Sequence, residues 1–371
     1  MNTLSTYLTD SKNIKDLHKP SILRLEYAED KATFNALFEN HEISFVYDEI
    51  YPQLQELIKC KNPSVQIADE EYAGLINKHL AGKDIAEYGV WVYYPWNQRM
   101  VHLLDEDEFI EVRTNRNRNK ITTEEQQKLK TKKIGIVGLS VGQSIALTIA
   151  MERTCGELRL ADFDTAELSN LNRIRTGVHN LGLNKTVIAA REILEIDPFL
   201  NVKIFAEGLN EDNIDEFFLG GDKLDVFIEV CDGLDLKITS RFKAREYQIP
   251  VVMDTNDRGM IDVERFDTEP DRPIFHGLAE GLDPISIKNL TNQEKIPHIL
   301  KMIGAETMSS RLKASMLEVK KSINTWPQLA SSVTLGGAAT TDVCRRILLD
   351  EFHDSGRYYV DLDEIISDKQ L

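Results

Sequence analysis

A short glycine-containing segment, GLSVG at residues 138–142, is the first candidate functional segment of the sequence. It follows the apolar run at 133–137, which predicts a strand, and it precedes a helical pattern. A strand that turns through glycines into a helix presents unpaired backbone N–H groups to an anion such as a phosphate. The candidate phosphate-binding residues of this segment are Gly138, Ser140 and Gly142.

The same five residues support a second interpretation. They spell G-x-S-x-G, which between a strand and a helix is the nucleophile elbow of α/β-hydrolases, with Ser140 as the nucleophile. Such an enzyme also needs a later acid and a histidine, for which Asp254 with His276 or His298 are available by order. The segment departs from the dinucleotide pattern G-x-G-x-x-G, and a turn without function is a third possibility. The glycine segment alone does not distinguish a phosphate-binding turn, a nucleophile elbow and a turn without function.

Two aspartates end the next predicted strand, at 157–164. Asp162 follows the glycine segment by roughly 20 residues, which is where a dinucleotide-binding fold places the acid that binds ribose hydroxyls. An aspartate at the end of a strand can also begin a turn and do nothing else. We interpret Asp162 as a ribose ligand and Asp164 as a second nucleotide-binding candidate.

Charged and amide side chains follow at Asn170, Arg173 and Lys185. An NAD enzyme holds its pyrophosphate mainly through backbone groups and has no need of these cations. An enzyme that breaks ATP between the α- and β-phosphates does need them, because fixed cations stabilise the charge that develops there. Asp232 follows the fourth predicted strand, and a lone carboxylate at that edge suggests a Mg²⁺ ligand completed by phosphate and water.

The elements that must position these residues alternate between strand and helix from about residue 113 to 275. Strands are predicted at 133–137, 157–164, 201–208, 225–231 and 250–254, and helices at 142–152, 185–196, 212–218 and 234–247. Continuous apolar strands interleaved with helices indicate a parallel sheet that is covered on both faces. The predicted fold class is therefore α/β, a Rossmann-like, doubly wound, mostly parallel sheet.

Residues 1–112 are predicted to form a smaller α+β domain of unknown role. Apolar residues recur at helical spacing within 45–60 and 70–80, and two strands at 88–94 and 99–104 predict a hairpin. No motif in this region points to chemistry.

The second predicted domain, 113–371, ends in a largely helical part from about residue 276. Its helix at 330–349 contains GGAA, small residues that allow close packing against another element. The polar tail at 361–371 is expected to fray.

Composition excludes several classes of protein. With 42% hydrophobic and 28% charged residues the chain is typical of a globular protein, and its net charge of −17 opposes binding to nucleic acid. No stretch approaches the ~18 apolar residues of a membrane span, and residues 1–20 do not read as a signal peptide, so we expect a cytoplasmic protein that binds no membrane. The four cysteines form no C-x-x-C pair, which argues against a local zinc site or redox dithiol.

The charged residues and their order resemble the ThiF/MoeB-like adenylyltransferases, relatives of ubiquitin-activating enzymes, over about residues 113–255. The resemblance rests on the glycine segment and on three later strings, DFDTAELSNLNR (162–173), LGLNK (181–185) and CDGLD (231–235). It implies that Asp162 binds the ribose, that Asn170 and Arg173 contact phosphates, that Lys185 holds the phosphates at the reacting centre, and that Asp232 coordinates Mg²⁺.

The resemblance also implies a reaction and a partner. A substrate carboxylate would attack the α-phosphate of ATP and form an acyl-adenylate and pyrophosphate; the carboxylate could belong to a protein or peptide C-terminus or to a small metabolite. Members of this family commonly donate an arginine across a homodimer from just before the first strand. The run RTNRNRN at 113–119 offers Arg116 or Arg118 for that role.

Three features depart from the family pattern. The glycine segment is shortened, the paired zinc cysteines are absent, and no cysteine lies between Cys231 and Cys344, where thioester-forming members carry theirs. We therefore expect adenylylation without an enzyme thioester. The alternatives are an NAD- or FAD-dependent oxidoreductase, which leaves Arg173, Lys185 and Asp232 without a role, and a non-catalytic nucleotide-binding scaffold.

Overall fold

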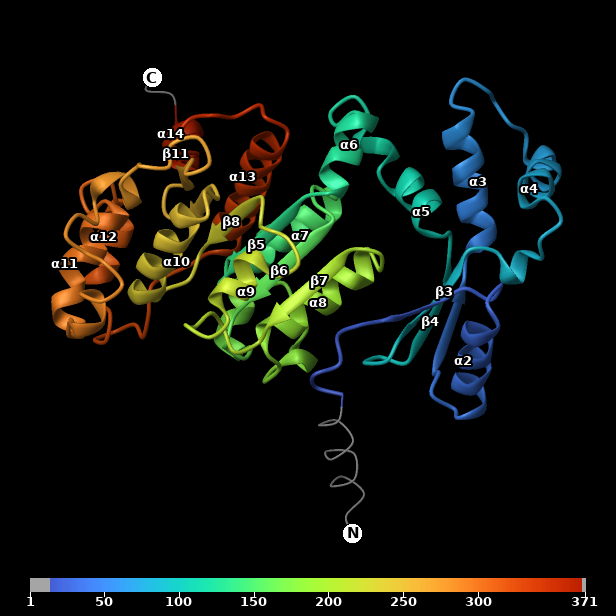
Figure 1. Cartoon of the computed structure of the whole chain (residues 1–371), viewed down its shortest axis with the longest axis horizontal. Helices are drawn as coiled ribbons and strands as arrows, with labels where there is room; N and C mark the ends of the chain where they lie inside the picture. The colour runs from blue at the N-terminus through green and yellow to red at the C-terminus, as the bar shows by residue number, and fades with distance from the viewer. Residues whose placement is uncertain (1–13, 369–371) are drawn as a thin grey trace, which may run out of the picture. The chain divides into compact units, whose positions relative to one another are not determined.

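The structure is a computed structural model that describes residues 14–368 (Figure 1). The chain forms two compact units: the first runs to Thr123 and includes the segment Leu194–Phe199, and the second comprises Glu124–Ile193 and the chain from Leu200 onward. Most of the N-terminal stretch considered for a signal peptide, and the last three residues of the tail, lie outside the described residues.

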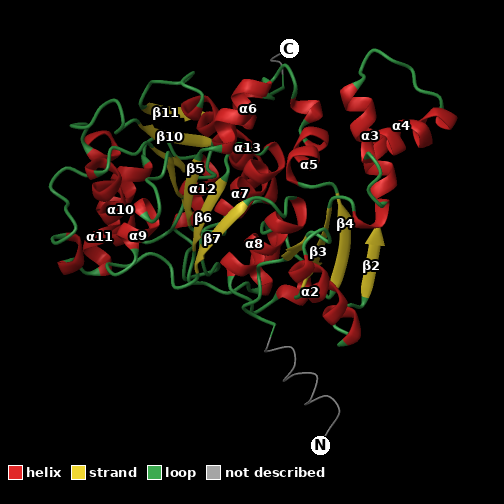
Figure 2. Ribbon diagram, turned by 45° about the vertical axis from the view of Figure 1, so that its right-hand side comes forward, coloured by secondary structure: helices red, strands yellow, loops and turns green. Residues whose placement is uncertain are grey.

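The first unit is built on a four-stranded sheet in the order β1-β3-β4-β2. Its strands are β1 (Ser21–Leu23), β2 (Phe45–Asp48), β3 (Val90–Tyr94) and β4 (Arg99–Leu103). The predicted hairpin is confirmed as the antiparallel pair β3–β4, while β2 pairs with β4 in parallel and forms an edge of the sheet (Figure 2).

Helix α2 (Ala28–Glu39) packs on this sheet through Phe34 and Leu37, which contact a cluster containing Trp91 and Tyr93. The other α-helices that the structure describes in this unit are α3 (Ile50–Lys61), α4 (Tyr72–Leu80) and α5 (Glu106–Arg113). The prediction of one helical pattern over 45–60 is wrong at its start, because Phe45–Asp48 is a strand. Its aromatic and β-branched residues favour an extended backbone once a partner strand is available.

The second unit contains a seven-stranded sheet in the order β11-β10-β9-β8-β5-β6-β7. The parallel strands are β5 (Lys133–Val137), β6 (Glu157–Ala161), β7 (Asn201–Phe205), β8 (Val226–Glu229) and β9 (Val251–Asp254). The first of these strands in the chain, β5, lies in the centre of the parallel part of the sheet. The chain continues to β6 and β7 on one side of β5 and then returns to β8 and β9 on its other side, as in a Rossmann-like sheet. The predicted fold class is confirmed, although four of the five strands are shorter than predicted.

The α-helices that the structure describes in the second unit are α6 (Thr123–Lys130), α7 (Gly142–Glu152), α8 (Lys185–Ile196), α9 (Ile214–Leu219), α10 (Leu234–Glu246), α11 (Asn292–Ile303), α12 (Ser310–Met316), α13 (Ala330–Leu348) and α14 (Leu362–Ile365). The first residue of α6 and the last three residues of α8, at 194–196, belong to the first unit. Phe217 of α9 and Ile238 of α10 belong to one buried cluster with Phe227 of β8. On α13, a Cβ added at Gly337 would lie 2.5 Å from Oγ of Ser144 in α7, so the close packing predicted for GGAA is confirmed.

Two further strands were not predicted. β10 (Met260–Glu264) and β11 (Gly356–Tyr359) extend the sheet in antiparallel fashion. The prediction of a fraying tail is wrong for its described part, because α14 forms and Asp361 Oδ2 accepts a 2.6 Å hydrogen bond from Arg258 Nε. That contact joins residues far apart in the chain, which local patterns do not reveal. Within residues 14–368 no helix is both long and apolar enough to cross a bilayer.

Candidate functional site

The carboxyl ends of β5, β6 and β8 lie level at one edge of the second unit's sheet. Val137 at the end of β5 pairs with Ala161 of β6 on one side and with Glu229 of β8 on the other. The glycine segment, which follows β5, therefore lies between the segments that follow β6 and β8. Ligands of open α/β sheets bind at this edge.

The glycine segment is held against β8 by close backbone contact. Gly138 has φ of +88°, and a Cβ there would lie 2.6 Å from the carbonyl oxygen of Val230, so only glycine fits. Gly142 begins α7, and a Cβ there would lie 2.8 Å from Cγ2 of Ile136. Within residues 14–368 the N–H groups of Ser140 and Val141 make no hydrogen bond. These donors at the start of α7 suit a phosphate.

Asp162 ties the glycine segment to the end of β6. Its Oδ2 accepts a hydrogen bond from the Leu139 N–H at 2.6 Å, and its Oδ1 accepts one from the Asp164 N–H at 2.8 Å. Burial raises the pKa of Asp162, while the charge of Lys185 and the two N–H groups act against that rise. Each carboxylate oxygen can accept a second hydrogen bond, so the predicted contact with ribose is compatible with this geometry.

Lys185 begins α8 and lies next to the same strand end. Its Nζ is 2.7 Å from Oδ2 of Asp164, and its side chain is 8% exposed against 52% for that of the aspartate. Asn184, which we did not predict, donates to the carbonyl of Asp162 at 3.2 Å and accepts from the Thr186 N–H at 2.8 Å. The detectable signal was an asparagine just before a helix, a capping residue.

Arg173 joins the glycine segment to the segment after β8. Its Nε donates to Oγ of Ser140 at 2.9 Å. Burial lowers the pKa of the Arg173 guanidinium, and the carboxylate of Asp232 opposes that shift, so the two charges interact. Asp232 is exposed and makes no side-chain hydrogen bond to any residue within 14–368. Ser140, Arg173 and Asp232 thus form one polar cluster, in which a hydrogen bond joins Arg173 to Ser140 and the charge of Asp232 acts on Arg173.

Asn170 has a local contact only. Its side-chain oxygen accepts a 3.1 Å hydrogen bond from the Glu167 N–H at the start of the short 3₁₀ helix Leu168–Asn172. No described contact joins Asn170 to the glycine segment, and its predicted role in phosphate binding stays a prediction.

Gln143 is a positioning residue that we did not predict. It is 2% exposed, and its Oε1 accepts from the Arg175 N–H at 2.9 Å. Its Nε2 donates to the Arg175 carbonyl at 3.1 Å and to Glu192 Oε2 at 2.8 Å. The amide thereby fixes the segment carrying Arg173 against the first turn of α7. Nothing in the sequence marks this glutamine, because its partners are more than 30 residues away.

A buried carboxylate supports the turn that carries Asp232. Glu229 is fully buried, and its Oε1 accepts from the Cys231 N–H and from Lys237 Nζ, both at 2.9 Å. Its Oε2 pairs with the guanidinium of Arg241. Burial alone would raise the pKa of Glu229, but Lys237 and Arg241 outweigh burial and hold that pKa at about 2. A fully paired charge of this kind fixes the local backbone.

Arg116 and Arg118 belong to the first unit, where Arg118 lies 3.6 Å from Glu111. Their role at the phosphates stays a prediction.

The hydrolase interpretation finds no support in the contacts. Ser140 bonds Arg173, while His276 Nε2 lies 2.9 Å from Asp262 Oδ1 and its Nδ1 lies 2.8 Å from Arg272. The carboxyl group of Asp254 bonds only the Asn256 N–H among the described residues. No described contact joins a serine, a histidine and an acid into a triad.

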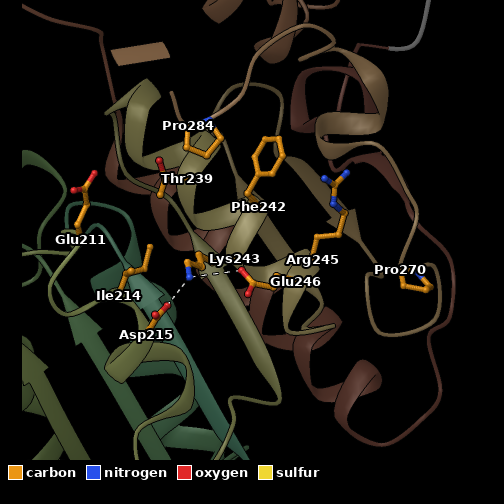
Figure 3. Close-up of a pocket in the computed structure, with 10 residues that line it drawn as sticks. All are labelled: Glu211, Ile214, Asp215, Thr239, Phe242, Lys243, Arg245, Glu246, Pro270 and Pro284. Atoms are coloured by element: carbon orange, nitrogen blue, oxygen red, sulfur yellow. Dashed lines mark ion pairs between the residues drawn. The ribbon is translucent and has the colours of Figure 1, made fainter. Parts of the chain in front are cut away.

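A cavity of about 580 Å³ lies elsewhere in the second unit, around α9 and α10 (Figure 3). None of the predicted nucleotide-binding residues lines it. Lys243 on its wall lies 2.9 Å from Asp215 and 3.6 Å from Glu246, so this cation is already paired within the protein. The acidic residues Glu211, Asp215 and Glu246 outnumber Lys243 and Arg245 in this lining, which does not favour the phosphates of a nucleotide.

The model of the ThiF family matches residues 114–325, more than half of the chain. The chain belongs to the ThiF family. The matched range contains the glycine segment and every predicted nucleotide-binding residue of the second unit, and also Arg116 and Arg118.

Individual relatives cover different shares of the ThiF-family chain. It is 46% identical over 307 residues to the uncharacterized protein MT1398 of Mycobacterium tuberculosis (strain CDC 1551 / Oshkosh), a match that covers 81% of this chain but 42% of that protein. It is 26% identical over 156 residues to the molybdopterin-synthase adenylyltransferase of Haemophilus influenzae, covering 42% of this chain and 63% of that enzyme. The chain thus spans less than two thirds of each relative.

Among solved structures, one similar protein is the E. coli tRNA N6-threonylcarbamoyladenosine dehydratase TcdA in complex with ATP. The TM-score is 0.48 and the identity 15%, with 67% of this chain and 98% of TcdA covered. A second is E. coli MccB with the peptide MccA-N7isoASN, at a TM-score of 0.43 and 13% identity, with 84% of this chain and 87% of MccB covered.

Proposed function

We propose that this ThiF-family chain binds ATP where β5 turns into α7 and uses it to adenylylate a carboxylate. The observation that carries the proposal is the cluster of Arg173, Ser140 and Asp232 beside the free N–H groups of the glycine segment. Lys185, paired with Asp164, adds a second cation at the same edge of the sheet. This combination suits phosphates and a divalent cation better than it suits a hydride-transfer cofactor.

The proposed reaction is balanced without a further reactant. An oxygen of the substrate carboxylate forms a bond to the α-phosphorus of ATP, and the bond between that phosphorus and the oxygen bridging to the β-phosphate breaks. The products are an acyl-adenylate and pyrophosphate. Arg173 and Lys185 stabilise the charge that develops on the leaving pyrophosphate, because both cations are partly withdrawn from water.

Each predicted ligand has a defined task in this proposal. Asp162 accepts hydrogen bonds from the ribose hydroxyls, and the N–H groups of the glycine segment hold a phosphate. Asp232 is suited to Mg²⁺, because it is an exposed carboxylate with no hydrogen-bond partner among the described residues. When bound, that ion neutralises phosphate charge. Arg173 must exchange its present partners, Ser140 and Asn172, for phosphate oxygens, and Lys185 must exchange Asp164.

We infer that the acyl group passes to a nucleophile outside the enzyme. Cys344 is fully buried in α13, and burial raises the pKa of its thiol far above neutrality. Burial also raises the pKa of Cys231, whose Sγ lies 3.1 Å from the Glu229 carboxylate. Neither is a reactive thiolate at neutral pH.

The substrate class and assembly rest on the same family proposal. The acid is a protein or peptide C-terminus or a small metabolite, and the enzyme acts as a homodimer in which Arg116 or Arg118 reaches the phosphates. Residues 1–112 form the separate N-terminal domain in this proposal, and the nucleotide-binding domain spans 113–371.

Calorimetric titration tests the nucleotide and isotope exchange tests the reaction. We expect ATP with Mg²⁺ to bind and NAD not to bind. ATP–pyrophosphate exchange should then appear with one of a panel of carboxylates, including peptide C-termini and free metabolite acids. Binding of NAD without binding of ATP would contradict the proposal. Tight ATP binding without exchange for any carboxylate would favour a non-catalytic scaffold.

A further inference from the structure

The first unit contains a cavity of about 300 Å³ that the proposed adenylylation does not use. Its lining comes from β2, β3, β4, α5 and the segment Leu194–Phe199, all of which belong to this unit. A volume of this size lies at the lower end of those that bind small molecules. The cavity therefore suits one small ligand rather than a nucleotide.

One wall of the cavity is an apolar face of the sheet. Tyr47 of β2 and Val92 of β3 both pair with Val101 of β4, and residues directly opposite on neighbouring strands share a face. Phe109 of α5 adds a second aromatic side chain to the lining. An apolar group of a ligand would be buried against this wall.

Arg99 brings an unneutralised positive charge to the cavity. It stands at the start of β4, opposite Phe45 on one side and Tyr94 on the other. Arg99 is exposed, and its guanidinium has neither a hydrogen bond nor an ion pair to any residue in the described range 14–368. A carboxylate is the natural ligand for such a guanidinium.

Asn97 and Glu195 bring unsatisfied acceptors to the same cavity. Oε1 of Glu195 accepts from Trp96 Nε1 at 2.6 Å and from Asn97 Nδ2 at 3.0 Å. Because a carboxylate only accepts, this contact fixes the Asn97 amide, and its Oδ1 is left buried with no partner among the described residues. Glu195 itself forms no ion pair with a described residue. Both groups favour a ligand that donates hydrogen bonds and carries positive charge.

We propose that this cavity binds a free α-amino acid with an apolar side chain. The ligand carboxylate pairs with Arg99, and its ammonium group donates to Oδ1 of Asn97 and to the carboxylate of Glu195. The side chain packs against Tyr47 and Phe109. Charge complementarity selects this class, because a simple anion would be repelled by Glu195 and a simple cation by Arg99.

Isothermal titration calorimetry of the full chain with L-leucine tests the proposal. We expect L-leucine to bind, and three analogues to bind at least about tenfold more weakly because each lacks one recognised group. L-Leucinamide lacks the carboxylate, N-acetyl-L-leucine lacks the ammonium, and glycine lacks the apolar side chain. These comparisons use the unmodified protein, so they do not depend on how a variant folds.

Three variants assign the binding to the cavity. Arg99→Met and Glu195→Gln should each weaken L-leucine binding at least about tenfold, since each removes one charged partner. Lys78→Met, which removes an exposed cation from α4, is the matched control and should bind as the unmodified chain does. Thermal unfolding by circular dichroism confirms that the three variants are folded.

Several results would overturn the proposal. They are absence of L-leucine binding at millimolar concentration, equal binding of L-leucinamide, and unchanged binding by Arg99→Met. Tighter binding of Gly-Gly-Leu or Leu-Gly-Gly than of L-leucine would also overturn it, because the site would then recognise a peptide end. None of these outcomes bears on ATP binding, which uses residues of the second unit.

Discussion

The nucleotide site of the second unit and the cavity of the first unit differ in whether their charged and polar side chains already have partners within the protein. At the nucleotide site, Arg173 bonds Ser140, Lys185 pairs with Asp164, and Asp162 accepts two backbone N–H groups. In the cavity, Arg99 has no ion pair with a described residue, and Oδ1 of Asn97 is buried without a partner.

This difference bears on how each site would bind. A nucleotide must displace contacts that the protein already makes, so the side chains are held near their working positions before it arrives. A ligand of the cavity would instead supply hydrogen-bond and ion-pair partners that Arg99 and Asn97 lack among the described residues. Its binding should therefore raise the free energy of unfolding of the first unit by mass action. Four sets of variants test this contrast.

Breaking the buried network beneath the nucleotide site should have the largest effect. Glu229→Gln leaves the charges of Lys237 and Arg241 without their shared carboxylate, and we expect a loss of about 3–5 kcal/mol in the free energy of unfolding. Urea unfolding measures this. Glu211→Gln removes an exposed carboxylate and is the control, expected to change stability by less than about 1 kcal/mol. Equal stabilities would show that the Glu229 network is not structural.

Removing the proposed metal ligand should impair the reaction at the nucleotide site and leave ligand binding in the cavity unchanged. Asp232→Ala should reduce ATP–pyrophosphate exchange by about 100- to 1000-fold, because the loss falls on the charged transition state. Asp212→Ala changes an exposed aspartate before α9 and should retain full exchange. L-leucine binding should be the same in the unmodified chain, in Asp232→Ala and in Asp212→Ala. Full exchange by Asp232→Ala would contradict its role.

Asp254 is an exception within the second unit, because burial raises its pKa to about 7 and its Oδ2 has no partner among residues 14–368. The unfolded chain loses this proton near pH 4 and the folded chain near pH 7, so stability falls as pH rises through that window. We expect the unmodified chain to lose about 2–3 kcal/mol between pH 5 and 8 relative to Asp254→Asn. Parallel pH profiles of the two proteins in urea unfolding would contradict the buried, protonated acid.

Ser140→Ala should have the smallest effect and decides between two interpretations of the glycine segment. If Ser140 only accepts from Arg173, its loss removes one hydrogen bond and weakens ATP binding by about tenfold or less. Thr148→Ala removes a hydroxyl from α7 whose described hydrogen bond is to the Ser144 carbonyl, and serves as the control. Complete loss of an esterase activity present in the unmodified chain would instead restore the nucleophile interpretation.

Much of the second unit was predictable from local patterns. Helices α7 and α8 have the bounds that periodicity predicted, and the parallel strands occur in the predicted order. The glycine segment, Asp162, Lys185 and Asp232 follow predicted strands or open a predicted helix, so strand order alone brought them to one edge. By contrast, Phe45–Asp48 is too short for its period to distinguish a strand from a helix.

The residues that hold the site in place were not predictable. Gln143 accepts a hydrogen bond from Arg175, 32 positions later in the chain. The charge of Glu229 on β8 is paired with Lys237 and Arg241, which lie on a different element, α10. A single polar residue has no period, and its partner is known only after the chain has folded. The cavity of the first unit was even less predictable from the sequence, because Arg99 and Glu195, which both line it, are 96 positions apart along the chain.

The parallel sheet, the turn from β5 into α7 and the charged residues along one edge were predictable from the amino-acid sequence, because strand and helix periodicities are local and parallel strands end on the same side of a sheet. Tertiary structure alone decided which of those charges are paired, that Ser140 faces Arg173 rather than a histidine, and that β10 and β11 complete the sheet. The physical reason is that pairing and burial depend on contacts between residues far apart in the chain, which only folding creates.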